Sequence, residues 1–254
     1  MTGRYGSRFG FEHNLSKPEG LEEEWAGIPL DEPLISDRLK ALGYRTGIVG
    51  KWHLGGGVPA QHPNARGFDF FFGMLGGGHQ YWPTVEKNSL QFNGESPTEI
   101  PTPYLTDWFT DEALNFINAR GKAAVGDEES DKPWFLYLSY NTPHSPMQAK
   151  DEDIAKFSHI KNKTRRIYCA MQACMDENIG RVISDLDASG QLENTLIVFL
   201  SDNGGSVEVS HAINAPLRGT KGTFLEGGIR VPALINWPNK IKPSRSDVPI
   251  QGLD

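Results

Sequence analysis

Cysteine is scarce in this chain of 254 residues, which contains only Cys169 and Cys174. On a helix, a separation of five residues turns two side chains about 140° apart, so we expect no disulfide between them. Both lie in a segment whose apolar residues repeat at helical spacing, and we interpret them as core cysteines. Two such thiols leave the redox compartment of the protein undecided.

Long apolar runs and an excess of positive charge are also missing. No stretch approaches the roughly 20 apolar residues of a membrane-spanning helix, and the residues after Met1 lack the apolar region of a signal peptide. The 25 Lys and Arg residues are outnumbered by 32 Asp and Glu, which gives a net charge of −7. A broad basic face for nucleic acid is therefore not expected, and contacts with an anion must be local.

What the chain does contain is a series of apolar segments with strand and helix periodicity. Apolar runs without polar alternation predict strands at 44–49, 134–140, 195–200 and 233–236. Residues spaced at helical periods predict helices at 31–42, 106–119 and 163–186, and the glycine-rich residues 50–78 are predicted to form a long loop. The pattern predicts an α/β fold, with a mostly parallel central sheet between two helical layers.

For two of the predicted helices, the sequence also predicts which side chains are buried. In the first, the expected buried side chains are Leu34, Ile35, Leu39 and Leu42. In the second, they are Phe109, Ala113, Phe116 and Ile117. The aromatic residues 70–72, 81 and 82 either pack in the core or stack on a sugar ring, and the sequence does not separate these two readings.

Polar motifs follow three of the predicted strands directly. They are GKWH at 50–53, PH at 143–144 and SDN at 201–203. In parallel sheets the functional loops lie beyond the carboxyl ends of the strands, so these motifs are candidates for a common site.

The SDN motif offers two hard oxygen donors, the carboxylate of Asp202 and the carboxamide of Asn203. Such donors suit Ca²⁺ or Mg²⁺ rather than a thiophilic metal, and the glycines that follow let the backbone turn tightly. An Asx-type turn that merely closes a strand is the alternative. Two ligands cannot hold a divalent ion alone, so further oxygens must come from elsewhere.

Cationic and proton-transferring side chains occupy the other motifs. Lys51 and His53 are two residues apart on a segment expected to be extended, so they should point the same way, as suits an oxyanion and proton transfer. His144 follows a predicted strand directly, although a lone histidine is more often structural. Each of these residues also has an ordinary explanation near a turn.

A glycine-punctuated loop, APLRGTKGTFLEGGIRVP at 215–232, carries the remaining candidates. Arg218 and Lys221 are interpreted as groups that grip an anion. Glu226 and Arg230 lie four residues apart, and we expect them to pair with each other rather than to take part in chemistry.

Taken in order, these segments resemble the sulfatase family of the alkaline-phosphatase-like superfamily. The resemblance runs from residue 1 to about residue 240 and rests on GKWHLG, RGFDFFFG, PHSP, SDNGG and RGTKGTFLEGGIRVP. The opening, MTGRYGSRFGF, is similar to the stretch that follows the family's formylglycine signature, and RGFDFFFGMLGGGHQYW resembles the branch of arylsulfatase B and the N-acetylgalactosamine sulfatases. The fold implied is the alkaline-phosphatase-like three-layer α/β/α architecture.

The resemblance implies a sulfate-ester hydrolase acting on a sulfated glycan. Asp202 and Asn203 resemble two metal ligands, for Ca²⁺ or alternatively Mg²⁺, and Lys51 and Lys221 resemble the lysines that bind sulfate oxygens. A mature protein of this kind carries formylglycine made by a formylglycine-generating or anaerobic sulfatase-maturating enzyme. It is expected in the periplasm or outside the cell.

The same resemblance implies roles for two histidines. His144 looks like the candidate general acid near the leaving-group oxygen, and His53 looks like the partner of the formylglycine hydroxyl and a candidate base. The developing negative charge on the ester oxygen requires a proton donor of this kind.

The family's two early aspartates, its modified Cys or Ser and its neighbouring arginine have no counterpart in residues 1–254. We therefore expect the chain to be a partial sulfatase catalytic domain, incomplete at both ends and inactive by itself. Two alternatives stay open. One is a phosphate- or phosphonate-ester hydrolase of the same superfamily, and the other is a non-catalytic fragment that binds sulfated glycans.

Overall fold

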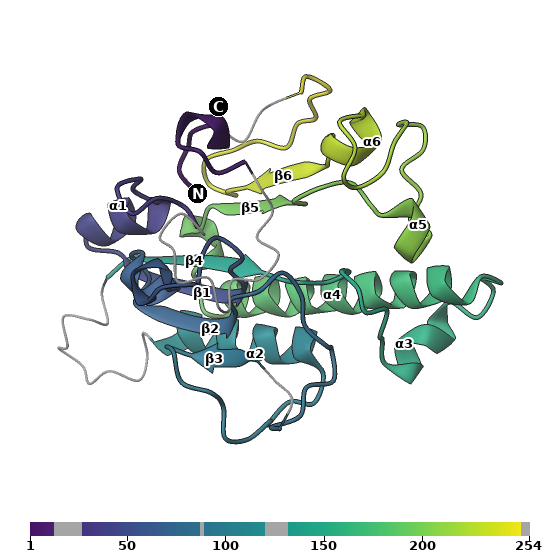
Figure 1. Cartoon of the computed structure of the whole chain (residues 1–254), viewed down its shortest axis with the longest axis horizontal. Helices are drawn as coiled ribbons and strands as arrows, with labels where there is room; N and C mark the ends of the chain where they lie inside the picture. The colour runs from purple at the N-terminus through teal and green to yellow at the C-terminus, as the bar shows by residue number, and fades with distance from the viewer. Residues whose placement is uncertain (13–26, 87–88, 120–131, 250–254) are drawn as a thin grey trace. The chain divides into compact units, whose positions relative to one another are not determined.

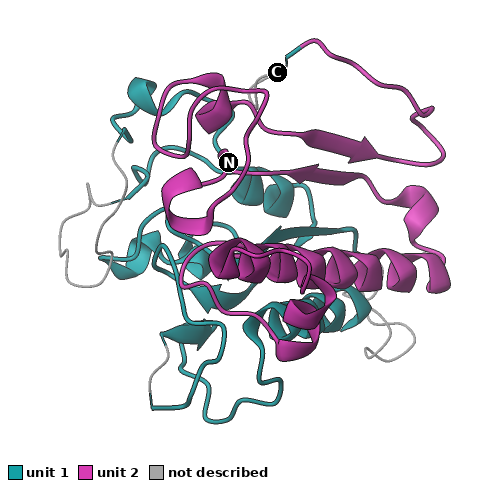
Figure 2. Ribbon diagram, turned by 90° about the vertical axis from the view of Figure 1, so that its right-hand side faces the viewer, with its two compact units in different colours: residues 1–141, 249–254 teal, residues 142–248 magenta. Residues whose placement is uncertain are grey.

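The computed structural model describes residues 1–12, 27–86, 89–119 and 132–249 (Figure 1). The chain divides into two compact units, coloured separately in Figure 2. Unit 1 comprises Met1–Asn141 and Pro249–Asp254, and unit 2 comprises Thr142–Val248. No helix in the described part of the chain is long and apolar enough to cross a bilayer.

Unit 1 is built on a four-stranded sheet in the order β3-β2-β1-β4 (Figure 1). Its strands are β1 (Arg45–Lys51), β2 (Phe70–Met74), β3 (Leu90–Phe92) and β4 (Trp134–Ser139). Strand β1 pairs in parallel with β2 and with β4, whereas β2 and β3 are antiparallel. The predicted mostly parallel sheet is confirmed.

Alternate side chains of the central strands bury the two faces of this sheet. Val49 of β1 and Phe72 of β2 lie in one cluster, while Ile48 and Phe71 lie in the other, as the period of two along a strand requires. The first cluster is completed by α2 (Leu105–Asn118) and the second by Leu34, which immediately precedes α1 (Ile35–Ala41). Helix, sheet and helix form the three predicted layers within unit 1.

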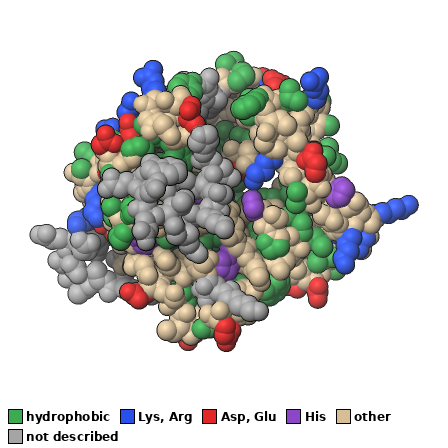
Figure 3. Space-filling view, in the orientation of Figure 1, with side chains coloured by type: hydrophobic (Ala, Val, Ile, Leu, Met, Phe, Trp, Pro, Cys, Tyr) green, Lys and Arg blue, Asp and Glu red, His purple; other side chains and the backbone are tan. Residues whose placement is uncertain are grey.

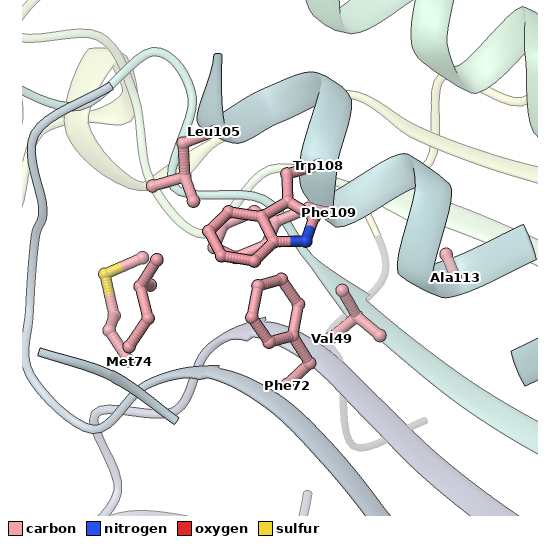
Figure 4. Packing of buried hydrophobic residues seen from close by; sticks show 8 residues of the cluster. Val49, Phe72, Met74, Leu105, Trp108, Phe109 and Ala113 are labelled. Atoms are coloured by element: carbon pink, nitrogen blue, oxygen red, sulfur yellow. The ribbon is translucent and has the colours of Figure 1, made fainter. Parts of the chain in front are cut away.

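Helix α2 fulfils its sequence pattern closely. All four predicted inner-face residues are buried, and Figure 4 shows Phe109 and Ala113 on the side that faces the strands. Phe72 lies under the indole of Trp108, with ring centroids 4.7 Å apart, and stacks on Phe92 at 4.2 Å. Such aromatic pairs add to the free energy gained by burying their large surfaces.

Two predictions for unit 1 were wrong in detail. Residues 50–78 are not one long loop, because β2 lies within them and its consecutive phenylalanines bury side chains on both faces of the sheet. Helix α1 begins at Ile35 rather than at residue 31, and both Ile35 and Leu42 are exposed, so only part of the predicted face packs inward. Among the aromatic residues, Tyr81 is fully buried and Trp82 is 41% exposed.

Unit 2 contains four helices and a separate two-stranded sheet. Its helices are α3 (Asp151–Lys156), α4 (Lys163–Ala188), α5 (Val207–Ser210) and α6 (Glu226–Ile229), and its strands are β5 (Ile197–Leu200) and β6 (Ala233–Asn236). Short 3-10 turns in the described residues of the whole chain are Gly6–Arg8, Pro59–Gln61, Pro63–Ala65 and Leu192–Asn194. Lys156 of α3 binds Asp153 at 2.8 Å and Glu177 of α4 at 2.6 Å, which fastens the two helices together.

Strand β5 differs from its prediction. It pairs with β6 in antiparallel fashion, and Val198 and Leu200 are 54% and 60% exposed. The continuous apolar run at 195–200 was read as a strand buried on both faces, and this was wrong for the described structure. Apolar composition sets what a strand can bury, but neighbouring elements decide whether it is covered.

Helix α4 matches its predicted extent within two residues, and Ala170, Met171, Cys174 and Leu186 of its apolar face are buried. Both cysteines are free thiols, as expected. Cys174 is a core residue, whereas Cys169 is only half-buried, so the prediction of a core position holds for one of the two.

Candidate active site

The end of strand β1 positions the two candidate residues of unit 1. Lys51 is the last residue of β1 and is aligned with Met74 of β2. Beyond the strand the ladder continues, since the amide of Trp52 donates to the carbonyl of Met74 at 2.9 Å and the amide of His53 to that of Leu75 at 3.0 Å. The backbone that carries Lys51 and His53 is therefore tied to a buried sheet.

His53 leaves the extended conformation at this point. Its φ is 51°, in the left-handed region that few residues other than glycine adopt. The alternation expected for an extended segment therefore does not apply to Lys51 and His53. A Cβ on Gly77 would lie 2.8 Å from Cε1 of His53, so the imidazole packs directly over this glycine and a side chain there would displace it. Unusual backbone conformations of this kind are concentrated at functional sites.

His144 belongs to unit 2, three residues into it, and its side chain is half-buried. Nδ1 lies 2.8 Å from the carbonyl oxygen of Ser145. A carbonyl can only accept a hydrogen bond, so the proton of this interaction sits on Nδ1 of the imidazole. Nε2 is then the atom that would exchange a proton with a ligand.

The SDN turn after β5 presents both predicted metal ligands. Asp202 is exposed and Asn203 is half-buried. The amide group of Asn203 donates to the carbonyl of Gly204 at 3.0 Å. Neither the carboxylate of Asp202 nor Oδ1 of Asn203 accepts a hydrogen bond from any residue that the structure describes, so both oxygens are available to a cation.

The cation-bearing loop also lies in unit 2. Arg218 and Lys221 are exposed, and within the described ranges their side chains form no ion pair or hydrogen bond. On the face drawn in Figure 3, Lys and Arg side chains are scattered among acidic ones, as the net charge of −7 leads one to expect. Two unpaired cations three residues apart are thus a local feature rather than part of a basic surface.

Hydrogen bonds join the SDN turn to the cation-bearing loop through one glycine, Gly205. Its amide donates to Oδ1 of Asn214 at 3.1 Å, and its carbonyl accepts from Nδ2 of the same residue at 2.8 Å. Nδ2 of Asn214 also donates to the carbonyl of Gly219 at 3.1 Å, and the amide of Lys221 donates to the carbonyl of Gly205 at 3.3 Å. The structure thereby brings the loops of Asp202 and Lys221 together.

Close backbone contacts reinforce this junction. The amide of Gly204 donates to the carbonyl of Gly228 at 2.9 Å, and that of Gly227 to Arg218 at 2.8 Å. A Cβ on Gly204 would lie 1.8 Å from the carbonyl oxygen of Gly227, which explains the glycines of the GG pairs. The role of Asn214 was not found from the sequence, because a lone asparagine two residues before a proline indicates only a turn.

Glu226, the first residue of α6, and Arg230, the residue after its end, form an ion pair at 3.5 Å with both side chains exposed. The expectation that they pair with each other is confirmed. Exposed pairs of this type contribute little to the free energy of folding.

The predicted site residues divide between the units: Lys51 and His53 belong to unit 1, and His144, Asp202, Asn203, Arg218 and Lys221 belong to unit 2. Within the described ranges, no group of three or more His, Cys, Asp or Glu side chains that could hold a metal is formed. Asp202 and Asn203 fit a hard divalent cation by donor type but supply only part of its usual six to eight oxygen ligands.

The sequence matches the profile of the family described as Sulfatase over residues 1–254. The chain belongs to the sulfatase family. The resemblance seen in the sequence motifs is therefore confirmed, together with the alkaline-phosphatase-like fold that it implied.

Among curated sulfatases, the chain is 35% identical to arylsulfatase J of Mus musculus over 241 residues, covering 94% of the chain and 39% of the relative. It is 31% identical to N-acetylgalactosamine-6-sulfatase of the same organism over 259 residues, covering 95% of the chain and 47% of the relative. The chain thus spans about half the length of the curated relatives it matches.

A comparison with solved structures also finds similarity over most of the chain and about half of the matched protein. A crystal structure of Ps i-CgsB in complex with k-i-k-neocarrahexaose is 42% identical in sequence, with a TM-score of 0.82, and the match covers 94% of this chain and 53% of that one. That similarity extends across both units of the chain.

Proposed function

We propose that the polypeptide containing this chain hydrolyses sulfate esters, with a sulfated glycan as its substrate. The observation that carries the proposal is the junction in unit 2, where the loop of Arg218 and Lys221 is hydrogen-bonded to the turn of Asp202 and Asn203, and none of these groups pairs with a charged side chain among the described residues. The cations suit the sulfate oxygens, and the oxygen donors suit a divalent metal. Relatives named as sulfatases support the reaction, and the similar protein Ps i-CgsB, solved in complex with k-i-k-neocarrahexaose, supports a glycan as the substrate class.

Each candidate residue then has one task. Lys51, Lys221 and Arg218 bind the non-bridging sulfate oxygens, and their positive charge stabilises the charge that develops as the ester bond breaks. Asp202 and Asn203 would contribute oxygen ligands to a Ca²⁺ ion, which would neutralise further negative charge at the sulfuryl group.

The two histidines handle protons. In its doubly protonated form His144 donates the Nε2 proton to the leaving alcohol, while Nδ1 keeps its proton in the hydrogen bond to the carbonyl of Ser145. His53 is the candidate base, and the hydrogen bonds that continue the ladder from β1 hold its backbone. Formylglycine supplies the nucleophile in sulfatases, and neither Cys169 nor Cys174 stands in its signature.

Sulfate release by the longest open reading frame that contains this chain tests the proposal. The protein is expressed in a host that makes formylglycine, and inorganic sulfate is measured with p-nitrophenyl sulfate and with sulfated oligosaccharides. We expect Lys221→Ala to lower kcat/KM by about 10²-fold or more, in the range seen on removing a group that stabilises transition-state charge. Lys240→Ala is the matched control, because Lys240 is an exposed cation outside the loop.

A second function is favoured by the same two cations. Arg218 and Lys221 can hold a sulfate group without any nucleophile, so the 254-residue chain can act as a binding module for sulfated glycans. Calorimetric binding of a sulfated oligosaccharide, with no sulfate released by any form of the protein, would favour this reading. Hydrolysis of p-nitrophenyl phosphate in preference to the sulfate would instead indicate a phosphate-ester hydrolase.

The remaining assignments are Ca²⁺ as the metal, a formylglycine-generating or anaerobic sulfatase-maturating enzyme as the partner, and a periplasmic or extracellular location. Hard oxygen donors at Asp202 and Asn203 support the choice of metal. Elemental analysis of Asp202→Ala against the unsubstituted protein checks the ligand assignment, and unchanged calcium content in the variant would contradict it.

A further inference from the structure

A shallow groove in unit 1, with a volume of about 450 Å³, has no place in the reaction just described. One wall is the segment 56–59, and the others include His62, Asn64, Ala65 and Gln91 of β3. The volume falls in the range of roughly 300–1,000 Å³ typical of small-molecule sites. Among the residues that the structure describes, no Lys, Arg, Asp or Glu lines the groove, so none of these lining side chains would pair with a charged sulfate group.

Hydrogen bonds fix the protonation of His62 in this groove. Nδ1 accepts from the amide of Asn64 at 3.3 Å, so this nitrogen carries no proton. The proton therefore sits on Nε2, which lies 3.1 Å from Oε1 of Gln91 and donates to it. Burial lowers the pKa of the His62 imidazole, and the hydrogen bond to Gln91 opposes that shift only in part. The neutral form is the one that fits these contacts.

This arrangement leaves one polar side-chain group available beside the aliphatic surfaces of the groove. The carboxamide oxygen of Gln91 is engaged by His62, and among the described residues its NH₂ group has no acceptor. A hydrogen-bond donor beside the aliphatic surfaces of Val58 and Ala65 suits a ring that bears hydroxyl groups and has an apolar face.

The groove is fastened to the end of β1. The indole N–H of Trp52, the residue between Lys51 and His53, donates to the carbonyl of Gln61 at 3.2 Å. The side chain of Gln61 in turn accepts from the amide of Gly56 at 3.4 Å. Gly56 follows His53 by only three residues, so the wall of the groove and the candidate sulfate-binding residue Lys51 share one anchored segment.

We propose that this groove is a subsite that binds an uncharged sugar ring of the substrate. The assignment of the sugar to a substrate rests on the proposed function, whereas its binding does not. The neutral side chains that line the described groove suit an unsulfated ring, and the hydrogen bonds of Trp52 and Gln61 join the groove to the segment that follows Lys51.

Binding is tested on the full chain by saturation-transfer NMR with methyl β-D-galactopyranoside as the probe. A ligand of this size is expected to bind with a Kd on the order of millimolar. Ala65→Trp fills the groove from an exposed position, and Gln91→Leu removes the free NH₂ group, so each should reduce the saturation-transfer signal at least fivefold. Ala60→Trp is the matched control, because Ala60 is also exposed but does not line the groove.

Circular dichroism and the thermal midpoint confirm that each variant is folded, and Ala65→Trp keeps the test open if Gln91→Leu unfolds. Absence of signal with the unsubstituted chain, or equal signals from chain and both variants, would overturn the proposal. In the longest reading frame, Ala65→Trp should raise KM for a sulfated oligosaccharide at least fivefold and leave p-nitrophenyl sulfate unaffected. If no sulfate is released at all but the sugar signals behave as stated, the proposed function fails while the subsite stands.

Discussion

The two units hold their candidate residues by different physical means. In unit 1, Lys51 and His53 extend from β1, whose Ile48 and Val49 are fully buried on opposite faces of the sheet. In unit 2, Asp202 and Lys221 lie in two loops. These loops are joined by the hydrogen bonds of Asn214 and by close glycine contacts. Apolar packing fixes the first region, and directional polar contacts fix the second.

This difference has a consequence for stability. A sheet covered by helices on both faces resists local opening, whereas two strands alone are marginal in water. Strands β5 and β6 of unit 2 expose Leu200, Leu234 and Ile235, each by more than half. We therefore expect unit 2 to open locally at lower free energy than the core of unit 1, and its loops to depend on each individual hydrogen bond.

The largest difference in the free energy of unfolding is expected between the variants of one buried and one exposed apolar side chain. Phe72→Ala should lower the free energy of unfolding by about 3–5 kcal/mol, because it removes a fully buried ring that contacts Trp108 and Phe92. Leu200→Ala in β5 should change it by less than about 0.5 kcal/mol. Urea titrations followed by circular dichroism measure both values, and similar losses would show that the two regions are equally well packed.

Within unit 1, a test separates positioning from stability. Gly77→Ala places a Cβ 2.8 Å from the His53 imidazole and should displace it, which lowers kcat/KM for p-nitrophenyl sulfate by roughly 10²-fold. Gly76→Ala is the control, since a Cβ there meets nothing within 4 Å. Equal activities of the two variants would indicate that the position of His53 does not matter.

In unit 2, Asn214→Ala removes three hydrogen bonds that join the two loops. At about 1 kcal/mol each, their loss should reduce amide-exchange protection of Gly205 and Gly227 by roughly 10–100-fold. Anion binding at Lys221 should weaken in parallel. Asn239→Ala, at an exposed position outside the junction, should leave protection unchanged. Unaltered exchange in the first variant would mean that the glycine contacts suffice.

The smallest effect is expected at the exposed ion pair of α6. Arg230→Ala should alter the free energy of unfolding by less than about 0.5 kcal/mol, because its partner Glu226 is well solvated. Raising the salt concentration should leave the difference within error. A loss above about 1 kcal/mol would assign this pair a structural role that its exposure does not suggest.

The sequence predicted those elements whose identity depends on local pattern. Helices α2 and α4 and strands β4 and β6 were placed within two residues, because their periodicity and flanking residues agree. Strand β2 was missed, since flanking glycines concealed an apolar run too short for periodicity to separate strand from loop. The exposure of β5 and the bonds of Asn214 depend on contacts distant in sequence, which no local pattern encodes.

The site was predictable to a similar extent. The rule that functional loops lie beyond strand ends pointed to Lys51, the last residue of β1, and to His144 and Asp202 in the segments that follow β4 and β5. The left-handed conformation of His53 was not predictable, because it arises from the ladder with Leu75 and the space above Gly77. The roles of all these side chains remain predictions.

The leaving-group dependence of sulfate release tests the central claim most directly. In the protein encoded by the longest reading frame that contains this chain, His144→Ala should slow sulfate release from a sulfated sugar by about 10²–10⁴-fold, the usual contribution of a general acid. Release from p-nitrophenyl sulfate should fall far less, because nitrophenolate departs without a proton. Equal losses on both substrates, or no sulfate from the unsubstituted protein, would contradict the account.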